Sequence, residues 1–230
     1  MKLAIIGYGK LGRAVGEAWV ESGGDLSSKI TSKDAWTAEG LDSDVVLESS
    51  TPETAAKNIL DCLDAGLPVV VGSTGWHSRF DEIESKVHET NGLVFHATNF
   101  SIGVHLMNVF ATEMARTMKL FEDYTPSITE AHHIHKLDKP SGTANTLKSK
   151  VENSGDYSFL KVDSIREGEI VGMHELVWDS EIDSISIKHD AKSRMGFALG
   201  AVKASNWILE LKSKGLSGVF TMDDMIKEIT

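Results

Sequence analysis

The residues best suited to chemistry in this chain gather in one segment, residues 130–144 (EAHHIHKLDKPSGTA). Three of the nine histidines, His132, His133 and His135, fall within this segment. Imidazole is the side chain that most easily gives and takes protons near neutral pH, and Lys136 adds a fixed positive charge directly after the histidines. The segment therefore predicts a site that moves protons on a small molecule.

The same segment predicts a binding place for an anion. Ser141, Gly142 and Thr143 stand at the start of a helical pattern. The amides at a helix N-terminus carry a partial positive charge and point toward an anion. Together with Lys136, this turn indicates that the small molecule is acidic.

Two other interpretations of the histidines remain open. On a strand His132 and His133 point to opposite faces, and no acid or cysteine joins them at ligand spacing, so we expect no metal site. The segment is also compatible with a polar strand exposed to solvent. If the strand stayed extended, His132 and Lys136 would lie ~13 Å apart, so a shared substrate requires the chain to bend after Ile134.

A second motif stands at the start of the chain. The apolar run at residues 2–6 predicts a buried strand, and residues 13–22 predict a helix. Between them the G-x-G-x-x-G spacing predicts a dinucleotide site, because its glycines permit a tight turn, a close approach to a pyrophosphate and close helix packing. The candidate contacts are Gly7, Tyr8, Gly9, Lys10, Leu11 and Gly12.

The elements that must position this motif alternate in type. Strands are predicted at residues 26–31, 44–50, 67–71 and 93–97, and helices at 53–65 and 79–89, with Thr51 as a cap for the first of these helices. This alternation indicates a parallel sheet, whose ligands bind at the carboxyl ends of the strands. The loops at that edge contain Gly72, Ser73 and Thr74, and His96, Ala97, Thr98 and Asn99. Spacing alone does not distinguish these loops from ordinary turns.

The end of the second strand bears on the choice of dinucleotide. An acidic residue directly at the end of this strand would bind the ribose hydroxyls, but the chain has Ser32, Lys33 and then Asp34 there. A hydroxyl and a cation suit a ribose 2′-phosphate, whereas Asp34 suits a plain ribose. A solvated strand end without ligand contact is the third alternative, so NADH and NADPH both stay open.

After Ser101 the pattern changes. A helix is predicted at residues 102–117, and strands at 127–136, 157–166, 169–178 and 182–189 surround one helix at 144–152. Helices return at 197–211 and 222–229. Many strands with few helices predict a second α+β domain after the α/β region at residues 1–100. The expected apolar face of the first helix consists of Val104, Met107, Val109, Phe110 and Met114.

Composition excludes several classes of function. The 230-residue chain has 23 basic and 34 acidic residues, which gives a net charge of −11. Such a charge repels nucleic acid and anionic membranes. No apolar run approaches the ~20 residues of a membrane span, and the glycine motif begins too early for a secretory leader, so the cytoplasm is expected. The single cysteine, Cys62, permits no internal disulfide and is expected to be a buried packing residue.

At this point the chain resembles the 4-hydroxy-tetrahydrodipicolinate reductase (dihydrodipicolinate reductase) family over nearly its whole length. The resemblance is carried by the glycine motif, residues 72–76 (GSTGW), 99–103 (NFSIG), 130–144, 193–195 (SRM) and 218–224 (GVFTMDD). The chain is shorter than many relatives between the second strand and Asp44, which implies that one βα unit of the nucleotide domain is missing.

The resemblance implies a role for each candidate residue. His132 would be the proton donor or acceptor, Lys136 a second proton donor, and His133 a substrate contact, while Gly142 and Thr143 would hold a substrate carboxylate. The nucleotide would lie on residues 7–12, 72–74 and 96–99. The fold implied is an α/β Rossmann-type parallel-sheet nucleotide domain at residues 1–100 and 200–230, rejoined by its C-terminal helices. A smaller α+β domain at residues 101–199 would bind the substrate and form a homotetramer.

The implied activity is an NAD(P)H-dependent reduction of 4-hydroxy-tetrahydrodipicolinate, via dihydrodipicolinate, to tetrahydrodipicolinate in the diaminopimelate route of lysine biosynthesis. Loss of water would give a conjugated imine, hydride would add to it, and the resulting enamine would need one proton. Two rivals are another two-domain Rossmann oxidoreductase, such as an amino-acid dehydrogenase, and a non-enzymatic NAD(P)H-binding sensor.

Overall fold

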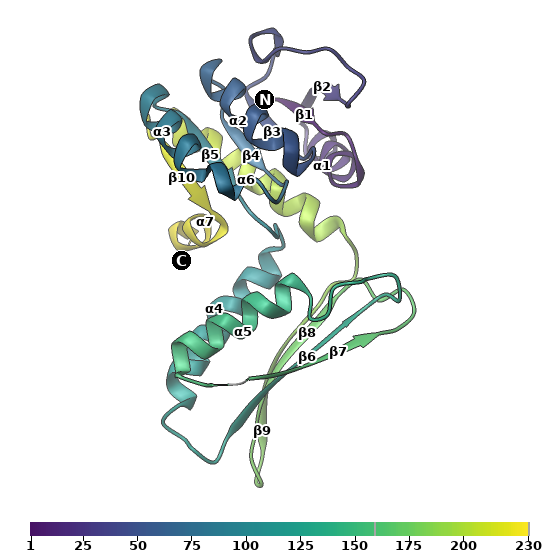
Figure 1. The fold of residues 1–230 in the computed structure, drawn as a ribbon, viewed down its shortest axis with the longest axis vertical. Helices are drawn as coiled ribbons and strands as arrows, with labels where there is room; N and C mark the ends of the chain where they lie inside the picture. The colour runs from purple at the N-terminus through teal and green to yellow at the C-terminus, as the bar shows by residue number, and fades with distance from the viewer. Residues whose placement is uncertain (159, 230) are drawn as a thin grey trace. The chain divides into compact units, whose positions relative to one another are not determined.

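The computed structural model describes residues 1–158 and 160–229, and the chain divides into two compact units (Figure 1). Unit 1 comprises Met1–Ser101 and Met195–Thr230, and unit 2 comprises Ile102–Arg194. Among the described residues, every helix is too short or too polar to cross a bilayer.

Unit 1 contains a sheet of six parallel strands in the order β10-β5-β4-β3-β1-β2. The strands are β1 (Lys2–Ile6), β2 (Asp25–Ile30), β3 (Val45–Glu48), β4 (Val69–Val71), β5 (Leu93–His96) and β10 (Gly218–Thr221). The helices are α1 (Lys10–Glu21), α2 (Pro52–Asp64), α3 (Phe80–Thr90), α6 (Met195–Ser213) and α7 (Met222–Ile229), with short 3-10 turns η1 (Ala38–Gly40) and η2 (His77–Arg79). Between β2 and β3 the chain has only η1, which agrees with a missing βα unit.

Helices cover both faces of this sheet. Ala4 and Ile6 point toward α2 and α3, where they join a fully apolar cluster with Ile59 and Ile83. Ile5 points the other way and touches α1. Helix α6 packs on α1 and on β3, β4 and β5 (Figure 1). Because both faces are buried, the inner strands β1, β3, β4 and β5 are largely continuous apolar runs, as expected of a parallel sheet, whereas the edge strand β2 is mostly polar.

Unit 2 contains a mixed sheet of four strands in the order β7-β6-β8-β9, in which only β6 and β7 are parallel. The strands are β6 (Thr125–His132), β7 (Lys161–Arg166), β8 (Met173–Asp179) and β9 (Ser184–Asp190), and the helices are α4 (Ile102–Met118) and α5 (Gly142–Gly155). Both helices pack on one face of the sheet, where Ile128, Leu176 and Trp178 meet Ala111 and Leu147. The α/β class with a smaller α+β part is confirmed.

Three predictions about elements are wrong. Strand β10 is missing from the prediction, because four residues carry little local signal and their pairing partner β5 lies far away in sequence. The strand predicted at 127–136 ends at His132, where the chain turns through Ile134 and His135. Thr51 precedes α2, but its side chain makes no capping hydrogen bond to the backbone.

Two further corrections concern unit 2. Val109 and Phe110 do not lie on the buried face of α4, which instead consists of Val104, Met107, Asn108, Ala111, Ala115 and Met118. Small alanines let this helix approach the sheet more closely than large side chains would. The strand predicted at 157–166 begins only at Lys161, and Phe159, which that prediction included, lies outside the described residues.

Candidate active site

The glycine-rich turn of unit 1 has the geometry of a phosphate-binding turn. Gly7 has φ +91°, and a Cβ atom there would lie 2.4 Å from the backbone of Ser49. A Cβ on Gly12 would lie 2.5 Å from the carbonyl oxygen of Gly7, so only glycine lets α1 begin this close to β1. Next to Gly9, in contrast, a Cβ would meet no atom within 4 Å. The turn thus leaves open space above its backbone, and it fits a dinucleotide pyrophosphate.

The loop after β4 lies beside this turn. A Cβ on Gly72 would lie 2.7 Å from Cδ2 of Leu11, so Gly72 lets the loop approach the start of α1. The hydroxyl of Ser73 donates a hydrogen bond to the carboxylate of Glu48, which is fully buried at the end of β3. Asn58 of α2 donates to the same carboxylate over 3.2 Å. Glu48 therefore fixes the loop that contains the candidate residues Gly72, Ser73 and Thr74.

The loop after β5 completes this edge. The amide of Ala97 donates to the carbonyl of Val71 over 3.2 Å, and Asn99 accepts a 2.8 Å hydrogen bond from the amide of Ser101. His96 is half-buried against the ring of Trp76, with 5.4 Å between the ring centroids. Burial lowers the pKa of His96, so its imidazole is neutral near pH 7.

Ser32 and Lys33 lie in an exposed turn after β2. The carboxylate of Asp34 accepts hydrogen bonds from the amide and the hydroxyl of Thr31, over 2.8 Å and 2.6 Å. These hydrogen bonds lower the pKa of Asp34, which is therefore an anion beside Lys33 at neutral pH. The turn offers charges of both signs.

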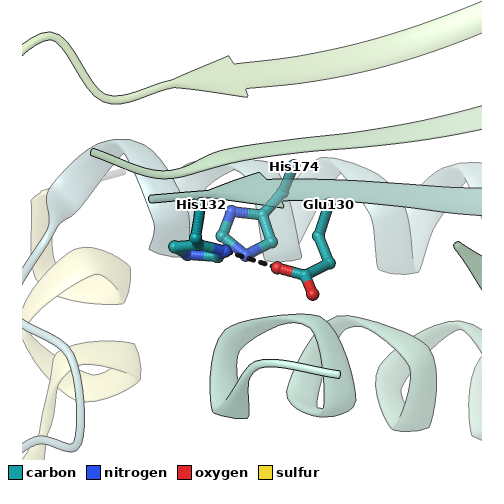
Figure 2. Close-up of side chains that lie close together, drawn as sticks. All are labelled: Glu130, His132 and His174. Carbon is teal, nitrogen blue, oxygen red and sulfur yellow. Dashed lines mark hydrogen bonds and ion pairs between the residues drawn. The ribbon is translucent and has the colours of Figure 1, made fainter. Parts of the chain in front are cut away.

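In unit 2, His132 is the last residue of β6 and is bonded to an acid on the same face of the strand. Glu130 is fully buried, and its carboxylate is hydrogen-bonded to Nδ1 of His132 (Figure 2). The other carboxylate oxygen of Glu130 forms an ion pair with Nη2 of Arg166 at 2.8 Å. Burial alone would raise the pKa of Glu130, but the side chains of Arg166 and Ser164 and the nearby His132 outweigh it and lower this pKa.

A second buried histidine completes the cluster. His174 on β8 lies opposite Glu130 in the antiparallel register, and its ring stands edge-on to His132 with 5.2 Å between centroids (Figure 2). Burial lowers its pKa to about 4, and the positive charge His132 can carry acts in the same direction. Its Nε2 lies 3.1 Å from the hydroxyl of Ser141.

Ser141 begins the helix that was predicted to hold an anion. Its hydroxyl accepts a 3.1 Å hydrogen bond from the amide of Ala144, so it caps α5. Gly142 is exposed at the first helical position, and Thr143 is half-buried. The helix start therefore presents its first amides at the surface of unit 2, next to the histidine cluster.

Lys136 lies in the loop between β6 and α5. Its ammonium forms an ion pair with Asp138 at 2.9 Å, and this contact lowers the pKa of Asp138, to which the amide of Gly142 contributes as well. His133 is half-buried, with its ring 6.2 Å from that of His135. The predicted bend after Ile134 is present, since the amide of Lys136 bonds back to the carbonyl of His133 over 3.1 Å.

The cluster also bears on the question of a metal. One ligand atom from each of Glu130, His132 and His174 lies within 4.8 Å of the others, so the expectation that no acid joins the histidines at ligand spacing is wrong. However, the guanidinium of Arg166 already neutralises Glu130, and a second positive charge there would be repelled. The cluster suits proton transfer better than it suits a divalent ion.

Four residues of these two sites were missed in the sequence. Glu130 had a usable signal, since residues i and i−2 of a strand share a face and Glu130 therefore lies beside His132. Arg166, His174 and Glu48 had none, because strand pairing brings each of them to its site from a distant part of the chain.

A phosphate-binding turn on a parallel sheet in one unit, and a buried imidazole–carboxylate pair in the other, define a two-domain nucleotide-dependent oxidoreductase. Comparison with known families gives the particular one. "Dihydrodipicolinate reductase, N-terminus" matches residues 1–100, and "Dihydrodipicolinate reductase, C-terminus" matches residues 103–226. The chain belongs to the dihydrodipicolinate reductase family and is an NAD(P)H-dependent oxidoreductase.

Individual relatives agree with this result. A 4-hydroxy-tetrahydrodipicolinate reductase of Christiangramia forsetii is 33% identical over 100% of this chain and 99% of its own length. One of Thermosipho africanus is 32% identical over 99% of both chains. The fold is similar to that of a dipicolinate-bound dihydrodipicolinate reductase from Paenisporosarcina sp. TG-14, with a TM-score of 0.82 and 20% identity over 96% of this chain and 97% of that one. The suspected family and the α/β fold class are confirmed.

Proposed function

We propose that the chain reduces 4-hydroxy-tetrahydrodipicolinate, via dihydrodipicolinate, to tetrahydrodipicolinate in the diaminopimelate route of lysine biosynthesis, with His132 and Lys136 as its proton-transferring groups. Full-length similarity to reductases of this name favours the reaction over an amino-acid dehydrogenase or a nucleotide sensor. In unit 2, His133, Ser141, Gly142 and Thr143 bind the substrate.

One observation carries the assignment of these residues. Within β6, His132 is hydrogen-bonded to Glu130, and on the neighbouring strand β8 His174 contacts Ser141 at the start of α5. The rings of His132 and His174 pack against each other, with 5.2 Å between centroids, so the two contacts lie side by side. These contacts place an imidazole next to a helix N-terminus that can hold a carboxylate. A proton donor and an anion site thus lie in one small region of unit 2, as reduction of an acidic imine requires.

Unit 1 binds the dinucleotide through its glycine-rich turn and the two neighbouring loops. When bound, NADH or NADPH supplies the hydride that the substrate accepts. The contacts are Gly7, Tyr8, Gly9, Lys10, Leu11, Gly12, Ser32, Lys33, Gly72, Ser73, Thr74, His96, Ala97, Thr98 and Asn99.

The side chains of unit 2 do the remaining work. The amides of Gly142 and Thr143 hold one substrate carboxylate, and Lys136 offers its ammonium to the negatively charged substrate. The 4-hydroxyl group and a hydrogen of the neighbouring ring carbon leave together as water, and the new carbon–carbon double bond makes the imine conjugated. After hydride addition the substrate is an enamine, which takes up one proton at carbon. Nε2 of His132 or Nζ of Lys136 supplies that proton.

The roles of His132 and Lys136 are tested by removing each group. His132→Ala and Lys136→Ala should each lower kcat by ~10²-fold or more, because each removes a group that transfers a proton. Substrate can be generated with dihydrodipicolinate synthase from pyruvate and aspartate semialdehyde, while NAD(P)H oxidation is followed. His135→Ala and Lys139→Ala are matched controls, since both side chains are exposed in the same segment. Near-normal kcat in both site variants would refute the assignment.

We also propose that the enzyme is a cytoplasmic homotetramer, as the family resemblance implies. The mixed sheet supports this, because α4 and α5 cover only one of its faces and β7 exposes Ile165 to 42%. Light scattering during size-exclusion chromatography should give four times the 25.0 kDa chain mass. A monomer at working concentrations would contradict the tetramer without affecting the proposed reaction.

A further inference from the structure

Glu130 is a fully buried acid with two partners of different kinds. One oxygen is hydrogen-bonded to Nδ1 of His132, and the other faces the guanidinium of Arg166 at 2.8 Å. Burial of a carboxylate is costly unless it is paired and hydrogen-bonded. The proposed reaction gives Glu130 no proton to transfer, so its burial calls for another explanation.

Arg166 is almost as deeply buried, with 7% of its side chain exposed. Its Nε donates to the carbonyl of Lys136 over 3.2 Å, and its Nη2 donates to the carbonyl of Asp138 over 2.5 Å. One guanidinium therefore contacts both the acid that holds His132 and the backbone that carries Lys136. This fork geometry is available to arginine and not to lysine.

We propose that Glu130 and Arg166 act as a positioning pair for both proton-transferring groups. Glu130 holds His132 with its proton on Nδ1, so that Nε2 is the atom that exchanges protons with the substrate. Arg166 holds the loop that presents Lys136. The inference rests on the proposed roles of His132 and Lys136, and it adds two residues that do not themselves touch the substrate.

The tautomer follows from what each group can donate. An ionised carboxylate only accepts hydrogen bonds, so Nδ1 of His132 must carry a proton. The pair can then stabilise the imidazolium when Nε2 is also protonated, as an acid beside a catalytic histidine does. Space around Nε2 is kept by a glycine, because a Cβ on Gly172 would lie only 3.1 Å from that atom.

Glutamine at position 130 would reverse this arrangement. Arg166 has only donors to offer, so it would draw the amide oxygen of glutamine, and the NH₂ group would face Nδ1 of His132. Nδ1 must then accept, and His132 can no longer gain a proton there without losing its partner. The shape of the site is preserved while the protonation of His132 is changed.

The test measures Glu130→Gln in the full-length enzyme. We expect kcat to fall about 100-fold, the lower end of what general acid–base catalysis contributes, with little change in KM for NAD(P)H or in inhibition by pyridine-2,6-dicarboxylate. Glu169→Gln, at an exposed acid three residues after Arg166 in the sequence, changes the net charge equally and should keep wild-type kcat. Wild-type kcat in Glu130→Gln would overturn the proposal.

A pH profile separates positioning from a merely structural role. The charged or titratable groups that act on His132 are Glu130, Arg166, Lys136 and His174. In Glu130→Gln the carboxylate no longer opposes the positive charges of Lys136 and Arg166. His132 should therefore be protonated only at lower pH than in the wild type, and the pH profile of kcat/KM should shift to lower pH. An unchanged profile with lowered kcat would point to general damage and would overturn the proposed role.

Arg166→Lys tests the other half of the pair. It keeps the positive charge but cannot bond Glu130 and two carbonyls at once, so kcat should fall at least tenfold. Arg116→Lys, in an exposed ion pair with Glu113, is the matched control. If Glu130→Gln fails to fold, Glu130→Asp gives the same test, because the shorter side chain keeps the charge but cannot reach both partners. A normal kcat in Glu130→Asp and Arg166→Lys would overturn the proposal.

The outcome is also distinguishable from a failure of the proposed function. If His132→Ala lowers kcat and Glu130→Gln does not, only the positioning role is wrong. If His132→Ala is itself normal, the proposed proton donor is wrong, and the role of Glu130 is refuted with it.

Discussion

The hydroxyl of Ser141 lies 3.1 Å from Nε2 of His174, and both residues are almost completely buried. Ser141 caps α5, whereas His174 lies on β8 opposite Glu130. The contact therefore joins the start of α5, where we propose that the substrate carboxylate binds, to the sheet that carries the imidazole–carboxylate pair. Burial disfavours the charged form of this imidazole and lowers the pKa of His174 to about 4, so the ring is neutral near pH 7.

This burial predicts a pH dependence of stability. The pKa of His174 is about 4 in the folded chain instead of the ordinary 6.5, so the unfolded chain binds more protons between these values. Stability should therefore be fully present above pH 6.5 and should fall as pH drops toward 4, by roughly 3 kcal/mol from this residue. Thermal unfolding followed by circular dichroism at several pH values measures the effect.

His174→Gln tests the source of that slope, because glutamine can still bond Ser141 but does not titrate. The variant should lose less stability on acidification than the wild type, although His96, His132 and His189 also have lowered pKa values and will keep part of the slope. His88→Gln, at an exposed position on α3, should leave the slope unchanged. Equal slopes in wild type and His174→Gln would exclude His174 as a contributor.

The parts of the structure that could be predicted from the sequence are those with local causes. Strand β1 and the glycine turn follow from an apolar run and from backbone geometry that only glycine adopts, as the φ of +91° at Gly7 shows. The bend after Ile134 followed from the length of an extended strand. Each of these inferences needs only a few neighbouring residues.

What could not be predicted depends on pairing between distant segments. His174 meets Glu130, and Arg166 lies beside His132, only because β8 and β7 pair with β6 in one register. A shift by one residue would turn every side chain of a strand to the other face. Strand β10 was missed for the same reason, since β5 supplies its hydrogen bonds.

The surroundings of His132 predict how activity depends on pH. Burial lowers its pKa below 6.5, and Lys136 and Arg166 act in the same direction against the opposing effect of Glu130. If protonated His132 supplies the proton, kcat/KM for the substrate should fall as pH rises through that lowered value. Bound substrate brings two carboxylates, which favour the imidazolium, so kcat should fall only at higher pH. Profiles of kcat and kcat/KM that coincide would contradict this coupling.

Asp138 occupies the partners that we assign to the substrate. Its carboxylate pairs with Lys136 at 2.9 Å, and the amide of Gly142 also stabilises its charge. Substrate must compete with this exposed contact, so Asp138→Asn should lower KM for the substrate. An exposed ion pair limits the gain to about fivefold. Asp163→Asn, which breaks an exposed pair with Lys161, is the control, and a raised KM in Asp138→Asn would show that Asp138 assists binding instead.

Thr143 provides a test of the proposed anion site at the start of α5. Thr143→Val keeps the shape of the side chain but removes its hydroxyl, so we expect a raised KM for the substrate and an unchanged unfolding temperature. Thr117→Val, which removes a hydroxyl from the exposed side of α4, should change neither quantity. Pyridine-2,6-dicarboxylate should inhibit the wild type and bind more weakly to Thr143→Val. Absence of inhibition in the wild type would refute a dicarboxylate site.

The turn after β2 predicts a weak choice between NADPH and NADH. Lys33 is exposed there and can meet a ribose 2′-phosphate, but an exposed pair is worth at most about a fivefold preference. Two hydrogen bonds from Thr31 fix the carboxylate of Asp34 in place and keep it ionised. Its repulsion of a phosphate reduces even that preference. We therefore expect the enzyme to use both cofactors, with a mild preference for NADPH. Lys33→Ala should remove the preference for NADPH without altering kcat/KM for NADH. A hundredfold preference of the wild type for either cofactor would show that the discriminating contact lies elsewhere.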